Sequence, residues 1–252
     1  MATKKEVMVA EQNNVELFPD EIPDFLKDKM DSCRGNEGMS QDDVVIPRLE
    51  VVQSLSACRK KNDPAYIEGA DEGMLYNSVT RELYGESCFV VPVVFRKVYL
   101  LWQDLSQGGG FGGSFTSREE AEAEHMKKDK PEDWEVVDTH EHYCLIVGND
   151  KSVTPIVMSM AKSKMKVSKK WNSLISLNGG DRFSRVYKVN GVADKNSANQ
   201  DFYNVAVSNA GFVTKDLYEK AEKFFEQYNK GGIKTDSNYD APVKADEEEM
   251  PF

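Results

Sequence analysis

One long apolar run, residues 88–102, constrains the fold more than any other part of the chain. It reads Cys-Phe-Val-Val-Pro-Val-Val-Phe-Arg-Lys-Val-Tyr-Leu-Leu-Trp, with many β-branched and aromatic residues and no helical period, which indicates a β-strand. A strand of this length would extend over about 50 Å, too far for a flat strand in a small domain. We therefore expect it to bend, with a bulge or an edge at Pro92, because proline cannot donate to a strand ladder.

Charge is distributed unevenly along the 252 residues. The net charge of −11 comes from the ends: residues 1–43 carry eleven acidic and five basic side chains, residues 236–252 carry six and one, and residues 44–235 carry twenty-six of each. Within this neutral part, residues 117–141 have ten acidic and four basic side chains, whereas residues 151–188 have nine basic side chains and one acid, Asp181. The separation favours an electrostatic role for the basic segment, although solvated faces of different charge would give the same pattern.

Alternating apolar residues and turn residues predict several further strands. They fall within residues 44–55, interrupted by Pro47, and at residues 73–79, 134–147 (with a break near Asp138), 153–160, 183–189 and 202–207.

Helices are predicted at four places. A short one is possible at residues 23–30, and a capping box from Ser117 to Glu120 predicts an acidic surface helix through about residue 128. Residues 162–178 change to a helical period and end at Gly179-Gly180. A last amphipathic helix runs from the cap Thr214 to Gly231-Gly232. The helix at 162–178 has an apolar side and an opposite lysine side; the apolar side consists of Val167, Trp171, Leu174 and Ile175.

About seven strands with a basic helix between two of them predict a mainly β fold with peripheral helices, in the form of an OB-like, five-stranded, partly open barrel with insertions and a C-terminal helix. The expected organisation is a flexible acidic arm at 1–43, an OB-like single-stranded-DNA-binding domain at 44–232 and a disordered acidic tail at 233–252. The chain shows no apolar stretch of eighteen residues and no signal sequence, so we expect a cytoplasmic protein. The four cysteines have no CxxC spacing, which favours reduced, structural thiols.

Strand 183–189 carries the first candidate binding site. Alternate positions put Phe183, Arg185 and Tyr187 on one face, and two rings around a cation would suit stacked bases and a phosphate. The lysine side of helix 162–178 lies next to it in sequence and could follow a phosphate backbone. Taken singly, each ring is also consistent with a core position, and Arg185 with a surface ion pair.

The combination favours nucleic acid. The candidate DNA-binding residues come from the basic segment, from the polar end of the long strand and from the glycine loop after it: Lys162, Lys164, Lys166, Lys169, Lys170, Arg182, Phe183, Arg185, Tyr187, Lys188, Arg96, Lys97, Tyr99, Trp102 and Phe111.

Other chemistry finds less support in the sequence. The glycine loop at 108–113 is followed by neither Lys-Ser/Thr nor a helix, so it does not match a phosphate-binding P-loop. His140, His142 and Cys144 share one strand face and are competent zinc ligands, but their spacing is not a familiar half-site, and we predict no metal and no cofactor. No nucleophile with a base and no nuclease-like carboxylate cluster is recognisable, so we predict no catalytic residues and a protein that is not an enzyme.

The last seven residues are Asp246, Glu247, Glu248, Glu249, Met250, Pro251 and Phe252. This ending resembles the acidic, phenylalanine-terminated tip of bacterial single-stranded-DNA-binding proteins, with Met250 in place of an isoleucine. The body, with residues 46–49, 73–77 and 98–102 and the glycine loop, resembles phage replication proteins of the same kind. The resemblance implies that residues 246–252 recruit replication or recombination proteins, such as a polymerase, a helicase or primase, or a nuclease. A terminal ring and carboxylate after several acids also suit a basic-rimmed apolar pocket on a partner.

We therefore expect a phage single-stranded-DNA-binding protein that coats exposed strands in replication, recombination or repair. Two alternatives stay open: a phage recombination annealing protein, which would share the basic groove, and a small metal-dependent nuclease.

Overall fold

The computed structural model describes residues 23–27, 34, 35, 37, 45–148, 152–196 and 199–231. The chain divides into two units, residues 1–40 and residues 41–252. Within the first unit, the described residues form the short helix α2 (Asp24–Lys27), and the rest of the helix predicted at 23–30 lies outside the described residues. The predicted partner-binding residues 246–252 lie outside them as well.

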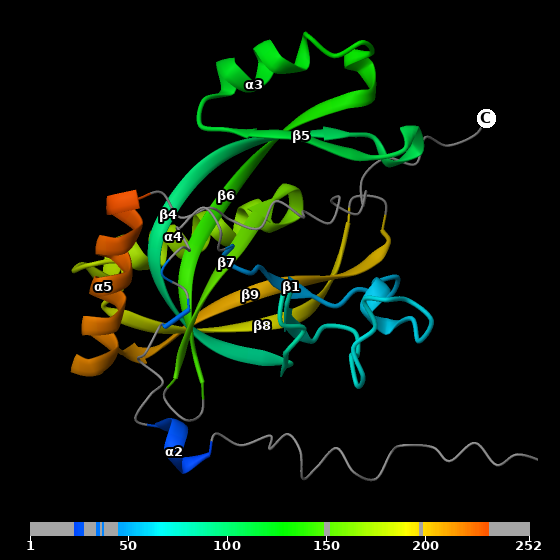
Figure 1. Ribbon diagram of the computed structural model, residues 1–252. Helices are drawn as coiled ribbons and strands as arrows, with labels where there is room; N and C mark the ends of the chain where they lie inside the picture. The colour runs from blue at the N-terminus through cyan, green and yellow to red at the C-terminus, as the bar shows by residue number, and fades with distance from the viewer. Residues whose placement is uncertain are drawn as a thin grey trace, which may run out of the picture. The chain divides into compact units, whose positions relative to one another are not determined.

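The second unit is organised around β4 (Ser87–Gln103). Along nearly its whole length β4 pairs antiparallel with β6 (Trp134–Val147); its first residues also pair with β8 (Arg185–Lys195) and its last with β5 (Gly110–Phe115). The pairing with β6 shifts register between Pro92 and Val94, so the predicted bulge at Pro92 is confirmed. In Figure 1, β4 and β6 curve together towards β5. The predicted break near Asp138 is absent, because Asp138 pairs with Tyr99 in a continuous β6.

Two more strands, β7 (Val153–Ala161) and β9 (Asp201–Phe212), complete the larger sheet in the order β7-β6-β4-β8-β9. A smaller antiparallel sheet contains β1 (Leu49–Val51), β2 (Leu75–Asn77) and β3 (Leu83–Gly85). The prediction of a mainly β fold with peripheral helices is confirmed, and across the described residues the strands form these two sheets without closing into a barrel.

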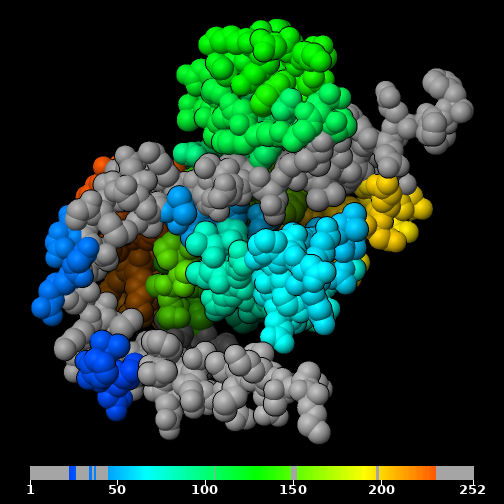
Figure 2. Space-filling model, turned by 45° about the vertical axis from the view of Figure 1, so that its right-hand side comes forward, coloured from blue at the N-terminus to red at the C-terminus, as the bar shows by residue number. Residues whose placement is uncertain are grey.

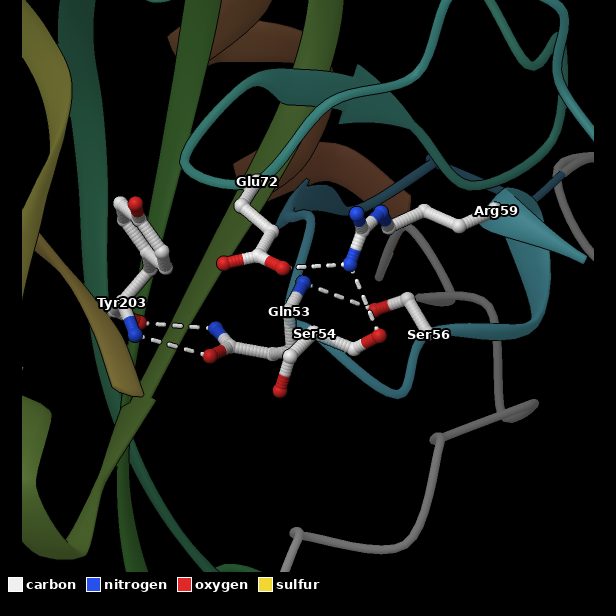
Figure 3. Close-up of polar contacts among 6 residues, drawn as sticks. All are labelled: Gln53, Ser54, Ser56, Arg59, Glu72 and Tyr203. Carbon is white, nitrogen blue, oxygen red and sulfur yellow. Dashed lines mark hydrogen bonds and ion pairs between the residues drawn. The ribbon is translucent and has the colours of Figure 1, made fainter. Parts of the chain in front are cut away.

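The segment around β1 connects both edge strands of the larger sheet. At one edge, the main-chain N–H of Val157 in β7 donates to the Pro47 carbonyl at 2.8 Å. At the other edge, the side-chain amide of Gln53 hydrogen-bonds the main chain of Tyr203 in β9 (Figure 3). The single segment 47–53 therefore spans the gap between β7 and β9.

The turn that carries Gln53 is held by its own polar contacts (Figure 3). The Gln53 N–H donates to Ser56 Oγ at 2.8 Å, and Arg59 donates to the Ser54 carbonyl at 2.9 Å. Arg59 also pairs with Glu72 at 2.6 Å, which joins the turn to the segment before β2.

Two helices cover opposite faces of the larger sheet. On one face, Trp171 of α4 (Met165–Asn178) packs with Cys144, and the predicted apolar side of this helix is confirmed, since Val167, Leu174 and Ile175 pack against the same cluster. On the other face, Leu217 of α5 (Lys215–Gly231) packs with Tyr143. Neighbouring residues of a strand point to opposite faces, so Cys144 faces the layer of α4 and Tyr143 faces the layer of α5.

The predicted capping box opens α3 (Arg118–His125). Ser117 Oγ accepts from the Glu120 N–H at 3.1 Å. The helix ends at His125, three residues earlier than predicted, and the chain then turns through residues 126–130. Figure 2 shows β5 and α3, in green, within a protruding lobe.

Cys58, Cys88 and Cys144 are buried, and Cys88 and Cys144 are free thiols. No helix in the described part of the chain is long and apolar enough to cross a membrane.

Candidate nucleic-acid interface

β6 presents His140 and His142 on the face covered by α4, and one hydroxyl joins them. Ser168 Oγ of α4 lies 2.7 Å from His140 Nδ1 and 2.7 Å from His142 Nε2. Trp171, one helical turn further along, stacks on the His142 ring with centroids 4.5 Å apart. Phe95 of β4 contacts both imidazoles edge-on, at 5.0 and 5.2 Å. The histidines are thus built into the contact between α4 and the sheet.

Arg182 closes this network from the loop after α4. Its Nη2 donates to His142 Nδ1 at 2.7 Å, and both terminal nitrogens donate to Asn172 Oδ1 at 3.1 Å. Its guanidinium also lies over the Phe95 ring, 5.4 Å from the centroid. The predicted DNA-binding residue Arg182 is therefore held in a half-buried internal network.

The hydrogen bonds assign the protons of both imidazoles. Arginine has no acceptor, so His142 Nδ1 must accept from Arg182. Burial lowers the pKa of His142 well below its usual range, and the nearby Arg182 and His140 lower it further, so the ring is neutral and its proton is on Nε2. His142 then donates to Ser168 Oγ. Among the described residues the Ser168 hydroxyl is hydrogen-bonded only to the two imidazoles, so we assign its own proton to the bond with His140 Nδ1. This order leaves the proton of a neutral His140 on Nε2.

The candidate zinc ligands His140, His142 and Cys144 have other contacts in the structure. Both ring nitrogens of His142 are hydrogen-bonded, and Cys144 Sγ donates to the His142 carbonyl at 3.4 Å. Within the described ranges, no group of three or more His, Cys, Asp or Glu side chains is placed to hold a metal ion.

A pocket of about 390 Å³ lies beside His140, between the start of α3, β6 and the start of α4. Four cationic side chains line it: Lys97, Arg118, Lys162 and Lys169. Two carboxylates, Glu135 and Asp138, line it as well.

Ion pairs satisfy only half of these cations. Lys162 pairs with Glu135 at 2.8 Å, and Arg118 pairs with Asp138 at 2.9 Å. Within the described part of the chain, neither Lys97 nor Lys169 has an ion pair. Burial lowers the pKa of His140, and both lysines lower it further, so the pocket holds an excess of positive charge around a neutral imidazole.

Comparison with known proteins places the chain in a family. Residues 10–234 match the family described as Pam3 phage gp34-like protein. The chain belongs to this family. The predicted phage origin is thereby confirmed, while the description of the Pam3 phage gp34-like family does not mention DNA. Neither a curated protein nor a solved structure matches the chain.

The predicted lysines of residues 162–170 lie together on one helix and the short 3-10 turn that precedes it. Lys166, Lys169 and Lys170 are exposed on α4, and Lys162 and Lys164 are half-exposed in the preceding turn, η5 (Lys162–Lys164). Lys97 joins them across the pocket, because it pairs with His140 in the β4–β6 register.

The predicted aromatic stripe does not form. Tyr187 is 1% exposed, in the cluster with Trp171, and Phe183 is 6% exposed, in the cluster with α5. β8 begins only at Arg185, and Phe183 lies in the turn before it, so the alternation of the strand does not extend to residue 183. Neither ring offers a face to a base in this structure.

The aromatic residues at the far end of β4 are also mostly internal. Trp102 is buried with Val98 and Leu100, and its ring lies 5.2 Å from Phe111, which is partly exposed in β5. Tyr99 is half-buried opposite Asp138.

Three predicted cations lie away from the pocket. Arg96 pairs with the buried Glu141 at 3.0 Å, and Glu141 alternates with His140 and so faces the opposite side of β6. Lys188 is exposed but alternates with Tyr187, so it faces away from α4. Arg185 lies over the Phe212 ring, 4.0 Å from its centroid.

The sequence analysis missed two residues of this region, Arg118 and Ser168, and an exposed ring elsewhere on the larger sheet, Phe212. Arg118 was detectable as the first residue of the capping-box helix, but its position at the pocket depends on β4–β5 pairing. Ser168 carried no signal, because one serine on a helix is ordinary. Phe212 ends a strand and is 72% exposed, and no local pattern distinguishes it from a core residue.

Proposed function

We propose that this phage protein binds single-stranded DNA through the lysine surface of α4 and the adjoining pocket, and acts as a binding protein rather than an enzyme. The observation that carries the proposal is the pair of lysines, Lys97 and Lys169, that share a pocket and have no ion pair among the described residues. Lys166 and Lys170 extend the same exposed surface along the helix. On a chain with net charge −11, an uncompensated basic surface is the part suited to a polyanion.

The exposed Phe212 favours unpaired bases over a duplex. One face of its ring is covered by the Arg185 guanidinium, and the side chain remains 72% exposed. Stacking of a base on an aromatic ring is worth about 1–3 kcal/mol and needs an unpaired base. We propose Phe212, in place of the buried Phe183 and Tyr187, as a stacking residue.

The acidic C-terminal residues 246–252 complete the proposal as a recruiting segment for replication or recombination proteins. Its support is the sequence alone: a terminal Pro251-Phe252 preceded by four acids. The same acids would compete with DNA for the lysine surface at low salt.

A salt-dependent titration with oligo-dT and with a duplex of equal length tests the DNA-binding proposal. Single strands should bind more tightly, and replacing Lys166, Lys169 and Lys170 with alanine should weaken binding and flatten the salt dependence. The charge-matched control replaces Lys215, Lys223 and Lys230 of α5, on the opposite face of the sheet. Equal affinity for the duplex, or equal effects of the two triple variants, would refute the proposal. Duplex formation from complementary strands would instead identify the annealing alternative.

A further inference from the structure

The pocket beside His140 has the composition of an anion site and not merely of a basic surface. Its volume of about 390 Å³ lies within the range of about 300–1,000 Å³ that is usual for small-molecule sites. Its carboxylates are already paired, Glu135 with Lys162 and Asp138 with Arg118. The two ammonium groups left over, on Lys97 and Lys169, reach the pocket from β4 and α4.

His140 adds a directed donor to these two charges. The chain of hydrogen bonds from Arg182 through His142 and Ser168 ends at His140 Nδ1, so the N–H of His140 is on Nε2. His140 lines the pocket, and among the described residues its ring is hydrogen-bonded only through Nδ1. The Nε2–H is thus the ring donor available to a ligand there.

We propose that this pocket binds one phosphate group, held by the Lys97 and Lys169 ammonium groups and by the Nε2–H of His140. Two cations and a neutral N–H donor suit a phosphate dianion or diester better than a base or an apolar group. The inference rests on the proposed DNA binding for the source of the phosphate, which is then a backbone phosphate of the bound strand. A free nucleotide would offer the same phosphate chemistry, and the experiment below distinguishes it from DNA as the ligand.

Binding should change the charge state of His140. The charged groups that act on it are Lys97 on β4, Lys169 on α4 and Asp138 on β6. The Arg118–Asp138 and Lys162–Glu135 ion pairs line the same pocket, and the neutral His142 lies beyond Ser168. A bound phosphate would offset the two lysines and favour the imidazolium form. His140 is therefore a reporter inside the site.

The test is nuclear magnetic resonance of the histidine side chains in the full-length protein. Inorganic phosphate, thymidine monophosphate and oligo-dT are added in turn, with sodium chloride at matched ionic strength as the reference. Each phosphate probe that binds should move the Nε2 signal of His140 and raise its pH of half-protonation by about 1. Replacing Lys97 and Lys169 together with methionine should abolish the response. The control Lys223→Met, at an exposed position of α5, should retain it.

The outcomes separate this inference from the proposed function. If oligo-dT binds while no probe changes His140, the phosphate site is wrong and DNA binding stands. If inorganic phosphate and thymidine monophosphate change His140 but oligo-dT does not bind, the pocket is a site for free phosphate compounds and the DNA-binding proposal is wrong. An unchanged response in the Lys97/Lys169 double variant overturns the assignment of the donors.

Discussion

The side-chain amide of Gln53 hydrogen-bonds both main-chain groups of Tyr203. Gln53 Nε2 donates to the Tyr203 carbonyl at 2.7 Å, and Gln53 Oε1 accepts from the Tyr203 N–H at 2.8 Å (Figure 3). Tyr203 lies in the edge strand β9, so one side chain provides what a neighbouring strand would provide. Together with the Pro47–Val157 hydrogen bond, it connects the two edges of the sheet.

Gln53→Glu should destabilise the protein. The glutamate carboxylate can still accept from the Tyr203 N–H, but it has no N–H to donate to the Tyr203 carbonyl. A carboxylate oxygen would then face that carbonyl oxygen. Leaving a part-buried polar group without its partner costs about 1–3 kcal/mol, measurable as a lower free energy of unfolding in urea. Gln107→Glu, an exposed glutamine, is the control for the charge change. Equal stability of the two variants would show that the Gln53 contact contributes little.

Gly191→Ala should also destabilise the fold. A Cβ at Gly191 would overlap the Gly73 carbonyl oxygen and lie 2.8 Å from its carbon, so β8 and the segment before β2 would have to separate. Overpacking of this kind costs about 1–3 kcal/mol. At Gly110, also in a strand, a Cβ would meet nothing closer than the Gln103 side chain at 3.4 Å, and Gly110→Ala should leave the melting temperature nearly unchanged. A melting temperature for Gly191→Ala like that of the wild type would contradict this close approach.

Stability should fall as the pH drops below about 6.5. Burial, Arg182 and His140 lower the pKa of His142 in the folded state, so from about pH 6.5 downwards the unfolded chain binds a proton that the folded chain excludes. His142→Gln keeps an acceptor for Arg182 and a donor for Ser168 without titrating. Between pH 7.5 and 5.5 it should lose less stability than the wild type, by roughly 1 kcal/mol, in urea unfolding. An identical loss in both proteins would mean that another group controls the pH dependence.

Phe212→Ala should weaken oligo-dT binding by roughly 1–3 kcal/mol and leave the salt dependence almost unchanged, because the ring contributes stacking and no charge. The matched variant is Phe89→Ala, which removes another exposed ring, 46% exposed in β4. Phe89 pairs with Lys188 in the β4–β8 register and faces away from α4, so its loss should leave affinity unchanged. Similar effects of both variants would remove Phe212 from the proposed interface.

Deleting Phe252 alone should abolish recruitment of replication or recombination proteins while leaving DNA affinity almost unchanged, because the Phe252 ring is the proposed anchor and carries no side-chain charge. Deleting residues 246–252 should additionally tighten DNA binding at low salt, with a gain that fades as screening increases. A pull-down from host or infected-cell extract beside a DNA titration measures both. Partner retention by the Phe252-deleted protein would show that the tail has another role.

Local sequence patterns determined most of the elements of this protein. The run at 88–102 became β4, Pro92 became its bulge, and Ser117 capped α3, because strand preference, the missing proline N–H and helix capping act over a few neighbouring residues. The lysine side of α4 followed from helical periodicity in the same way.

Only the tertiary structure decided which of these side chains meet. Phe183 and Tyr187 are internal because both faces of the sheet are covered, by α4 and by α5, and they do not share a face because Phe183 lies in the turn before β8. The pocket proposed to bind phosphate combines Lys97, Arg118, His140 and Lys169, which are far apart in sequence. They come together through the pairing of β4 with β6 and the packing of α4 on that sheet. Pairing and packing depend on the whole chain. A contact between distant segments forms only where the curvature of the sheet and the helices packed on it bring the two segments together, and neighbouring residues in the sequence do not determine this.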